Sequence, residues 1–533
     1  MKIIIPMAGS GKRYNEVAFH GPKPLVEIDG KPMIEHVINM FSFEDEFIFI
    51  CHEEHLKETQ LKKVLLNLAP KSKIVSVTTD QIRGGPLYTC SNVFNLVGDN
   101  EEVIINYCDF TLKWNYSDFL AEINQRRCDG AVISFQGFHP ASLGDTYYAY
   151  LKVDQERYLT ELREKEPFTK ENRMDDYAST GTYYFRKWSD FKRYTQKVMD
   201  ANMNTKGETY ITHPYILMIK DGLKVLNYEV EKFICWGTPR DYEVYKFWSE
   251  FFFRRSGQAI GFNNVNIKTT NLFPIAGNKK DFKLLGFDTP NFLIPLMGKP
   301  LIASTVKFHP RGIRNIFICL EEHKTEYQLD SLLKGIFPHS ETIYLETETK
   351  GNAETIIHAE KYLLPQNPIC ISGSSFILDY DERKLAHLFE NEETDVILLT
   401  FTHHECVLRN PNYHSYLKFK NGLVERVYEK TTISSRPERD HAFTGTVIYR
   451  HASDLFNSIR RNMTRLDQEG YTSFTTYSFL TAVNELIKEG KKVAAFEVDK
   501  FVSLLTPQDY QEFIYWQDYF DSLSYHPYSK MVH

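Results

Sequence analysis

The chain has 533 residues, of which 42% are hydrophobic and 25% charged, and this is the composition of a folded protein with more than one domain. Its net charge of −7 excludes the clustered basic surface that general nucleic-acid binding needs, so we expect small-molecule ligands and no nucleic acid. No apolar run reaches the roughly 18 residues of a membrane span. The eight cysteines form no CxxC pair, which indicates reduced thiols and a cytoplasmic protein.

The first elements of the chain alternate between strand and helix patterns. Residues 2–6 predict a buried strand, a glycine-containing loop follows, and residues 31–41 and 46–52 predict an apolar helix and a second strand. Such alternation is typical of an α/β fold with a parallel sheet. The nearly all-apolar run over 102–110 predicts a central strand that ends near Asp109. Ligands of these sheets bind beyond the carboxyl ends of the strands, where we expect the glycine loop and Asp109.

Two short segments after the first strand are suited to phosphate binding. In the loop Gly9-Ser10-Gly11-Lys12-Arg13, glycines let backbone N–H groups approach phosphate oxygens, and the cations neutralise their charge. In Pro22-Lys23-Pro24-Leu25, a lysine stands between two prolines, so little entropy is lost when its charge is fixed at a phosphate. A tight turn and a solvated turn are the plain alternatives, because neither a P-loop nor a complete dinucleotide-binding motif is present.

Asp109 and the pair Gly84-Gly85 are further candidates for a binding site. An ionised Asp at the end of an apolar strand needs a cation or a donor, and Mg²⁺ held by one or two carboxylates and by nucleotide phosphates suits that position. A helix N-cap is the alternative for Asp109. Gly84-Gly85 permits a close backbone approach to a nucleobase or a sugar.

The second half of the chain repeats the first. Ala8-Gly9 returns as Ala276-Gly277, and the motif GKP at 30–32 returns at 298–300 with the same spacing. We therefore predict two copies of one fold, over residues 1–255 and 266–533. Each copy ends in an aromatic-rich helix that either packs into its core or forms a domain or subunit interface, so a homo-oligomer is compatible with the sequence.

Taken in order, these motifs resemble the NTP transferases of the sugar-1-phosphate nucleotidylyltransferase family. The matching residues are Ala8-Gly9-Ser10-Gly11-Lys12-Arg13, Pro22-Lys23-Pro24-Leu25, Gly84-Gly85, Asp109, Glu164-Lys165, Thr180-Gly181 and Gly237-Thr238-Pro239. The resemblance implies two tandem Rossmann-like nucleotidyltransferase (GT-A-like) α/β domains with mixed, mainly parallel sheets. It also implies an enzyme that converts an NTP and a sugar 1-phosphate into an NDP-sugar and pyrophosphate.

The resemblance further implies a role for each matching residue. Arg13 and Lys23 hold the triphosphate as catalytic cations, and Mg²⁺ on Asp109 bridges it. The predicted nucleotide-binding residues are Ala8, Gly9, Ser10, Gly11, Gly84 and Gly85. The predicted substrate-binding residues are Glu164, Lys165, Thr180 and Gly181, with Lys165 on the sugar phosphate. The attacking phosphate is largely dianionic near neutral pH, because its second pKa is about 6, so no general base is required.

Two departures from the family pattern affect the metal and the acceptor. Cys235 stands where the family usually has a second metal-binding Asp. The second carboxylate is then expected from Glu231, or Asp109 serves with water and phosphate ligands alone. The segments "NYCDF" and "CWGTP" are similar to divergent transferases associated with bacterial surface-polysaccharide genes. The acceptor is therefore a sugar 1-phosphate for surface glycan or a non-sugar phosphate, phosphocholine-like or phosphonate-like, used with CTP.

The second copy has lost the charged residues of the first. Lys279, Asp281, Asn291 and Ser375 stand at the positions of Gly11, Arg13, Lys23 and Asp109. An acid at 281 would repel a triphosphate, so we predict a non-catalytic, degenerate second domain that is structural, interface-forming or ligand-sensing. Two alternatives remain. In the first, Asp379-Tyr380-Asp381 holds a metal and a sugar nucleotide, as in glycosyltransferases, unless it simply caps the next helix. In the second, both halves bind nucleotide sugars without turnover, as a sensor.

Overall fold

The computed structural model describes residues 1–9, 14, 21–144, 147–255, 267–277, 280–391, 393–470 and 477–529. The chain forms two compact units: unit 1 comprises Met1–Ser256 together with Tyr515–His533, and unit 2 comprises Gly257–Ile514. The division falls within the last helix, α18 (Pro507–Ser522). The sequence analysis assigns all of 266–533 to the second domain, whereas the residues from Tyr515 onward belong to unit 1.

Aromatic packing explains why the C-terminal segment belongs to unit 1. Helix α9 (Pro239–Arg255) buries Tyr245 and Phe252, and the ring of Phe520 lies 5.5 Å and 5.6 Å from theirs. Trp516 lies 5.8 Å from Tyr245. Burial of large aromatic rings contributes strongly to stability. The C-terminal segment is therefore most stable where it packs against the aromatic cluster of α9. An aromatic pattern along a helix does not tell which of two similar cores the helix will join.

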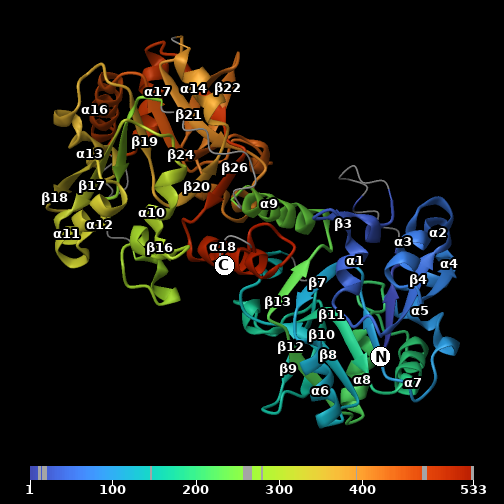
Figure 1. Cartoon of the computed structure of the whole chain (residues 1–533). Helices are drawn as coiled ribbons and strands as arrows, with labels where there is room; N and C mark the ends of the chain where they lie inside the picture. The colour runs from blue at the N-terminus through green and yellow to red at the C-terminus, as the bar shows by residue number, and fades with distance from the viewer. Residues whose placement is uncertain are drawn as a thin grey trace. The chain divides into compact units, whose positions relative to one another are not determined.

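Within the described residues, unit 1 contains a nine-stranded mixed sheet (Figure 1). Its strands follow the order β5-β4-β1-β6-β11, and β11 also pairs with β8 and with β9. β8 pairs in turn with β12, and β9 pairs with β10. β1, β4, β5 and β6 are parallel, and β11 is antiparallel to β6. The strands are β1 (Lys2–Pro6), β4 (Glu46–His52), β5 (Lys73–Val77), β6 (Val103–Asn106), β8 (Gly130–Phe135), β9 (Ala149–Val153), β10 (Leu159–Glu164), β11 (Tyr177–Phe185) and β12 (Val225–Glu229), with the short pair β2 (Glu27–Ile28) and β3 (Lys31–Pro32) outside this sheet.

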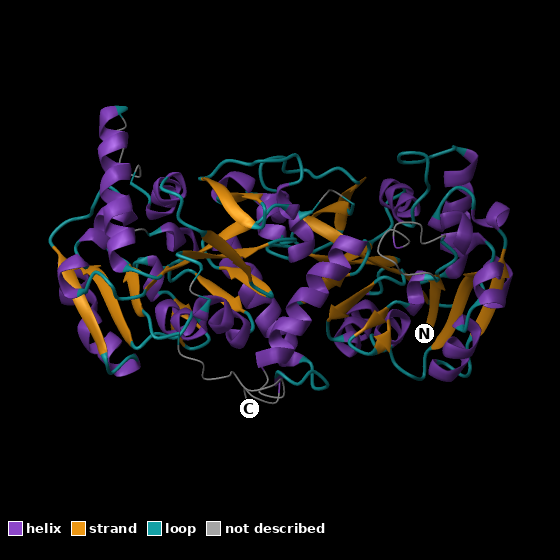
Figure 2. Ribbon diagram, turned by 90° about the horizontal axis from the view of Figure 1, so that it is seen from above, coloured by secondary structure: helices purple, strands orange, loops and turns teal. Residues whose placement is uncertain are grey.

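Helices cover both faces of this sheet, as Figure 2 shows. Successive residues of a strand point to opposite faces, so Ile3 and Ile5 join one core and Ile4 joins the other. The first core is closed by α1 (Met33–Ile38), α3 (Leu61–Leu68) and α6 (Tyr116–Arg126), and the second by α5 (Pro86–Ser91), α7 (Trp188–Asp200) and α8 (Thr212–Lys220). The short helices α2 (Glu53–Glu58) and α4 (Thr79–Ile82) complete the described helices of this part.

The apolar run over 102–110 forms two strands, and this corrects the single strand that we predicted. β6 belongs to the main sheet, whereas β7 (Phe110–Lys113) pairs with β13 (Lys232–Cys235) in a separate antiparallel ladder. The backbone leaves the main sheet at Tyr107, whose N–H donates to the Gly181 carbonyl at 3.1 Å. Asp109 therefore lies in the turn between two strands. Hydrophobicity alone does not reveal such a bend, because both sides of it are buried.

Unit 2 repeats the arrangement of unit 1 strand for strand. In its described part the sheet order is β18-β17-β14-β19-β24-β21-β25, and the hairpin β22-β23 is attached to β24. The strands are β14 (Thr270–Pro274), β15 (Pro295–Leu296), β16 (Lys299–Pro300), β17 (Arg314–Leu320), β18 (Ser340–Leu345), β19 (Ile369–Ser372), β20 (Phe376–Asp379), β21 (Val396–Phe401), β22 (Tyr416–Lys420), β23 (Leu423–Tyr428), β24 (Ala442–Tyr449), β25 (Val493–Glu497) and β26 (Lys500–Ser503). The predicted fold class, two mixed and mainly parallel α/β sheets in tandem, is confirmed.

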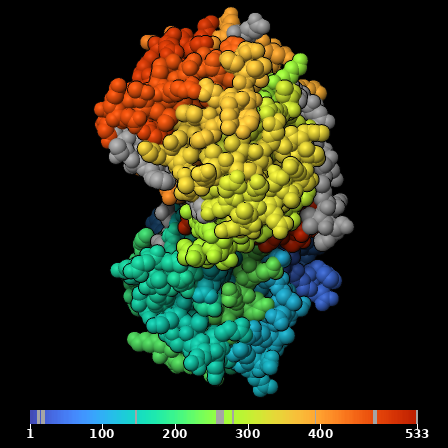
Figure 3. All heavy atoms as spheres, turned by 90° about the vertical axis from the view of Figure 1, so that its left-hand side faces the viewer, coloured from blue at the N-terminus to red at the C-terminus, as the bar shows by residue number. Residues whose placement is uncertain are grey.

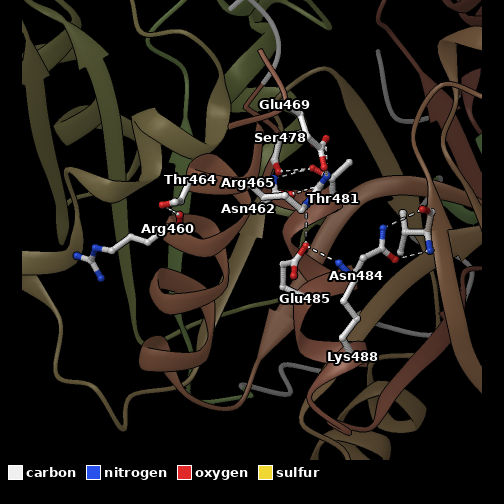
Figure 4. Close-up of polar contacts among 11 residues, drawn as sticks. Arg460, Asn462, Thr464, Arg465, Glu469, Ser478, Thr481, Asn484, Glu485 and Lys488 are labelled. Atoms are coloured by element: carbon white, nitrogen blue, oxygen red, sulfur yellow. Dashed lines mark hydrogen bonds and ion pairs between the residues drawn. The ribbon is translucent and has the colours of Figure 1, made fainter. Parts of the chain in front are cut away.

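Polar side chains join two helices of unit 2, α16 (Ala452–Gln468) and α17 (Phe479–Lys488), as Figure 4 shows. The Asn462 amide donates to the Thr481 hydroxyl at 3.0 Å, and the Arg465 guanidinium donates to Glu485 at 3.1 Å. The other helices of this unit are α10 (Leu301–Thr305), α11 (Glu321–Tyr327), α12 (Leu329–Ile336), α13 (Asn352–Ile357), α14 (Glu382–Glu390) and α15 (Glu405–Arg409). The surface of the segment that holds α11 to α13 is drawn in yellow in Figure 3. Of the helices described in either unit, none has the length and apolar character that a membrane crossing requires.

Candidate active site

Lys23 and Asp109, the predicted cation and metal ligand, meet in unit 1. Lys23 opens the short 3₁₀ helix η2 (Lys23–Leu25), which begins after Pro22 and is closed by a hydrogen bond from the Leu25 N–H to the Pro22 carbonyl. The Lys23 Nζ lies 2.7 Å from Asp109 Oδ2 and also donates to the Gly237 carbonyl. Burial alone would lower the pKa of Lys23, but the Asp109 carboxylate raises it above its ordinary value. The lysine therefore stays charged.

The turn after β13 brings another carboxylate to this place. Cys235 ends β13, and its sulfur accepts the Gly237 N–H at 3.2 Å. Asp241, in the first turn of α9, accepts the Thr238 N–H at 2.9 Å and the Thr238 hydroxyl at 2.8 Å. A Cβ on Gly237 would lie 3.1 Å from Cys235 Sγ, 3.6 Å from Asp241 Oδ2 and 3.8 Å from Asp109 Oδ2. Glycine thus leaves space that two carboxylates and a thiol border.

Asp109 and Asp241 together fit a magnesium ion. Mg²⁺ in nucleotide enzymes is held by one or two carboxylates and takes its other ligands from phosphates and water. Burial raises the pKa of Asp241, and a bound cation would relieve that cost. In the part of the chain that the structure describes, no cluster of three or more metal-ligating side chains exists, so phosphate and water oxygens would supply the other ligands of a bound ion.

Glu231, the predicted alternative source of the second carboxylate, does not lie at this site. Its carboxylate pairs with Lys113, and 58% of its side chain is exposed. Glu231 precedes β13, whereas Cys235 ends that strand, and each residue of an extended strand advances by about 3.3 Å. Asp241 takes its place because the turn of residues 236–238 returns the chain toward Asp109. The sequence analysis missed Asp241, whose repetition as Asp509 was the available signal.

Glu164 and Lys165 lie at the end of β10, on the other side of the candidate site. Lys165 has a left-handed φ of 61°, and its Nζ lies over the Tyr210 ring, 4.3 Å from the centroid, and contacts the Tyr210 hydroxyl. Burial raises the pKa of Glu164 to about 7, although the Thr212 hydroxyl donates to its carboxylate and Lys165 is close. Glu164 is therefore partly protonated at neutral pH, while Lys165 can present an ammonium group to a phosphate.

Thr180 and Gly181 form the centre of β11. The Thr180 hydroxyl donates to the Ile133 carbonyl at 3.0 Å, so it ties β11 to β8. Gly181 has a φ of +104°, and a Cβ there would lie 2.9 Å from the Tyr107 ring and 3.0 Å from the Phe110 ring. Only glycine adopts this positive φ without strain and also has no Cβ to clash with the two rings. Gly181 thus lets two aromatic rings close the floor of the site.

A single cavity of about 260 Å³ unites these residues in unit 1. It is lined by Asp109, Glu164, Lys165, Thr180, Gly181, Cys235, Gly237, Thr238 and Asp241. Aromatic side chains supply much of the remaining wall, namely Tyr107, Phe110, Tyr147, Tyr148, Tyr183, Tyr210 and Phe233. The sequence analysis did not single out these rings, because they come from strands and turns far apart in the sequence. The arrangement can hold a small polar molecule with a phosphate between Lys165 and the Asp109 side.

The predicted nucleotide-binding residues are only partly described. Ser10, Gly11 and Arg13 lie outside the described residues, while Ala8 is buried and Gly9 is exposed after β1. Gly84 and Gly85 have φ of +114° and +109°, and a Cβ on Gly85 would lie 2.7 Å from the Thr209 carbonyl oxygen. The close approach at Gly85 is therefore made by this protein's own backbone.

Two of the positions that changed in unit 2 bond to each other. The Asn291 amide donates to the Asp281 carboxylate at 2.9 Å, and the Asp281 N–H donates to Asn291 at 3.1 Å. Ser375 keeps the backbone contact of Asp109, since it accepts the Leu504 N–H as Asp109 accepts the Trp236 N–H. Asp509, the counterpart of Asp241, lies 3.7 Å from the Arg409 guanidinium. Unit 2 thus pairs its remaining acids with its own donors.

The motif Asp379-Tyr380-Asp381 has a capping role in unit 2. Asp381 is the N-cap of α14, and its carboxylate accepts the N–H groups of Arg383 at 2.9 Å and Lys384 at 3.3 Å. This is the capping alternative that the sequence analysis weighed.

Both halves of the chain match models of NTP transferase domains. Residues 3–171 match the model of the MobA-like NTP transferase domain, and residues 285–529 match that of the Nucleotidyl transferase family. Over 232 residues the chain is 27% identical to a bifunctional sugar-1-phosphate nucleotidylyltransferase/acetyltransferase from Sulfurisphaera tokodaii. That alignment covers 43% of this chain and 51% of the relative, so the chain spans about half the length of the curated relative.

Two solved structures are similar to one half of the chain. The nucleoside-diphosphate-sugar pyrophosphorylase from Vibrio cholerae RC9 aligns with 20% identity and a TM-score of 0.38, over 46% of this chain and 98% of that one. The inositol-1-phosphate CTP transferase from T. maritima aligns with 15% identity and a TM-score of 0.37, over 46% and 93%. The two family models match separate halves of the sequence. The chain thus carries two NTP transferase domains in tandem, each matched by a family model of its own.

Proposed function

We propose that unit 1 is a nucleotidylyltransferase that moves an NMP group from an NTP to a sugar 1-phosphate and releases pyrophosphate. The observation that supports this most is the cavity that joins Glu164 and Lys165 to Asp109 and Asp241. It offers an acceptor pocket next to a place for a metal and a triphosphate. We also propose a cytoplasmic reaction, which the scattered cysteines without a CxxC pair support, and the use of the product for surface polysaccharide, which the similarity of "NYCDF" and "CWGTP" supports.

In this proposal the chain's own residues position phosphates and neutralise charge. Lys165 holds the acceptor phosphate, and Lys23, with Arg13, holds the triphosphate. The acceptor oxygen then attacks the α-phosphorus in line with the departing pyrophosphate, and no general base is needed because the acceptor is largely dianionic. Bound between Asp109 and Asp241, Mg²⁺ would supply charge neutralisation to the triphosphate. With a metal held by Asp109, Lys23 would turn from that carboxylate toward the phosphates.

A second candidate function is cytidylyl transfer to a phosphorylated amino alcohol such as phosphocholine. The observation that favours it is the lining of the cavity, where seven aromatic side chains surround Glu164 and Glu208. Aromatic faces and carboxylates attract a quaternary ammonium group. The same rings can stack on a sugar, so this lining serves either acceptor.

Pyrophosphate release tests both candidates. The purified protein is incubated with Mg²⁺ and each common NTP, against a panel of sugar 1-phosphates and phosphocholine. Release with one sugar 1-phosphate, and its loss in Lys165→Ala, supports the first function. Release with CTP and phosphocholine alone supports the second. Absence of release with every pair would refute both.

A further inference from the structure

The wall of the acceptor cavity is supported by a residue far along the chain. Phe233, in the middle of β13, lines the cavity, is 2% exposed and stacks on Phe135 at 4.7 Å with an interplanar angle of 13°. The described part of β13 pairs only with β7, in a two-stranded ladder. A strand with so little sheet around it needs another partner to hold its position.

Tyr515 is that partner. Its hydroxyl donates to the Phe233 carbonyl at 2.9 Å and accepts the Phe233 N–H at 3.1 Å. In an antiparallel pair, alternate residues turn both backbone groups away from the neighbouring strand, and Phe233 is such a residue opposite Leu112. Tyr515 therefore takes the place that a third strand would fill.

The neighbours of Tyr515 fix its ring and its hydroxyl. His139 Nδ1 lies 3.1 Å from the Tyr515 hydroxyl. With the proton on Nδ1, His139 donates to this hydroxyl, which then donates one hydrogen bond and accepts two. Burial lowers the pKa of His139 to about 4, so the ring is neutral. The Lys232 ammonium lies over the Tyr515 ring, 4.3 Å from its centroid. The Tyr515 side chain is only 6% exposed.

Through β13 this contact reaches the reacting groups. Two residues after Phe233 comes Cys235, and the turn then places Gly237, whose carbonyl accepts from Lys23. Trp236 in this turn is fully buried, and its ring lies 5.4 Å from Tyr245, which packs on Trp516 at 5.8 Å. The C-terminal segment of unit 1 thus supports both the strand and the turn.

We propose that Tyr515 is a positioning residue for the reaction of unit 1, acting through Phe233 to set the wall of the acceptor cavity. This inference rests on the proposed function. It assigns a task in catalysis to the segment 515–529, which follows unit 2 in the sequence and belongs to unit 1. The Tyr515 hydroxyl binds Phe233, which lines the acceptor cavity, whereas the turn that meets Lys23 is packed through Tyr245 and Trp516. Removal of this hydroxyl should therefore change acceptor binding more than nucleotide binding.

The test is Tyr515→Phe in the full-length protein, with Tyr510→Phe as the matched control. Tyr510 lies on the same helix, and its hydroxyl donates to the Pro295 carbonyl in unit 2 at 2.7 Å. We expect Tyr515→Phe to raise the KM for the acceptor about 10-fold and to leave the KM for the NTP within about 2-fold. Hydrogen exchange should become faster at the Phe233 amide, and Tyr510→Phe should change neither quantity.

Three results would overturn the proposal. These are wild-type exchange at Phe233 in Tyr515→Phe, an unchanged acceptor KM despite faster exchange, or equal increases in both KM values with a fall in Tm. A wild-type protein that turns over no substrate pair would refute the proposed function instead. In that case the exchange measurement still decides whether Tyr515 holds Phe233.

Discussion

Units 1 and 2 share their strand order and differ in what stands at four matched positions. Where unit 1 places Lys23 against Asp109, unit 2 places Asn291 against Asp281 and has Ser375 in place of the carboxylate. The turn glycines and the pair Glu164-Lys165, repeated as Glu429-Lys430, remain in both. The comparison separates residues that build this fold from residues that bind charge. Four pairs of substitutions test that separation.

The largest difference is expected at the metal position. On the proposed function, Asp109→Asn should reduce kcat/KM by about 1,000-fold, because it removes a carboxylate charge that would hold a metal beside the triphosphate. Ser375→Ala, the matched control in unit 2, should leave activity unchanged. Pyrophosphate release measures both. Loss of activity in Ser375→Ala with retention in Asp109→Asn would show that the roles of the two units are reversed.

The two lysines after the repeated glutamates should differ next. Lys165→Ala should raise the KM for the acceptor by about 10- to 100-fold, since a charge-assisted hydrogen bond to a phosphate is lost. Lys430→Ala should leave it unchanged. Steady-state kinetics with varied acceptor measure this. Equal effects of the two substitutions would mean that unit 2 also takes part in acceptor binding.

The turn glycines should behave alike in the two units. A Cβ on Gly85 would lie 2.7 Å from the Thr209 oxygen, and one on Gly351 would lie 2.4 Å from the Tyr477 oxygen. Both φ angles are positive, so Gly85→Ala and Gly351→Ala should each cost about 2 kcal/mol of stability. Denaturant unfolding measures the loss. A harmless Gly351→Ala beside a damaging Gly85→Ala would instead indicate a nucleotide-binding reason for Gly85.

A pH-dependent effect is expected at Glu164. Its pKa is raised from 4.5 to about 7 in the folded protein, so the folded state binds this proton more tightly than the unfolded state. The carboxyl therefore costs no stability below pH 4.5, and the cost grows from there to about pH 7 and is complete above it.

Glu164→Gln should accordingly stabilise the protein at pH 8, on the order of 2 kcal/mol, and have little effect at pH 4.5. Burial also raises the pKa of Glu429, so Glu429→Gln should have the same sign. Thermal unfolding at the two pH values measures this. A larger gain at the lower pH would contradict the assignment of a raised pKa to these carboxyls.

The ordered motifs predicted much of the candidate site, because their order along the chain resembles that of a family whose site residues can be matched one by one to this sequence. Asp109, Glu164, Lys165, Thr180 and Gly181 all line one cavity. Asp241 was not predicted, because an acid in the first turn of a helix has the pattern of an ordinary cap, and Asp241 does accept hydrogen bonds from Thr238. The place of Tyr515 depends on tertiary packing that no local pattern encodes.

The discontinuous make-up of unit 1 has a consequence for the order in which the protein is made. Phe233 and Tyr515 share a hydrogen bond although they are 282 residues apart in the sequence. At synthesis rates of about 5–20 residues per second, the ribosome needs tens of seconds to cover that distance. During this time unit 2 is synthesised, and β13 lacks its hydrogen bonds to the Tyr515 hydroxyl. The support of Phe233, which lines the cavity of unit 1, is thus completed only when helix α18 has been translated.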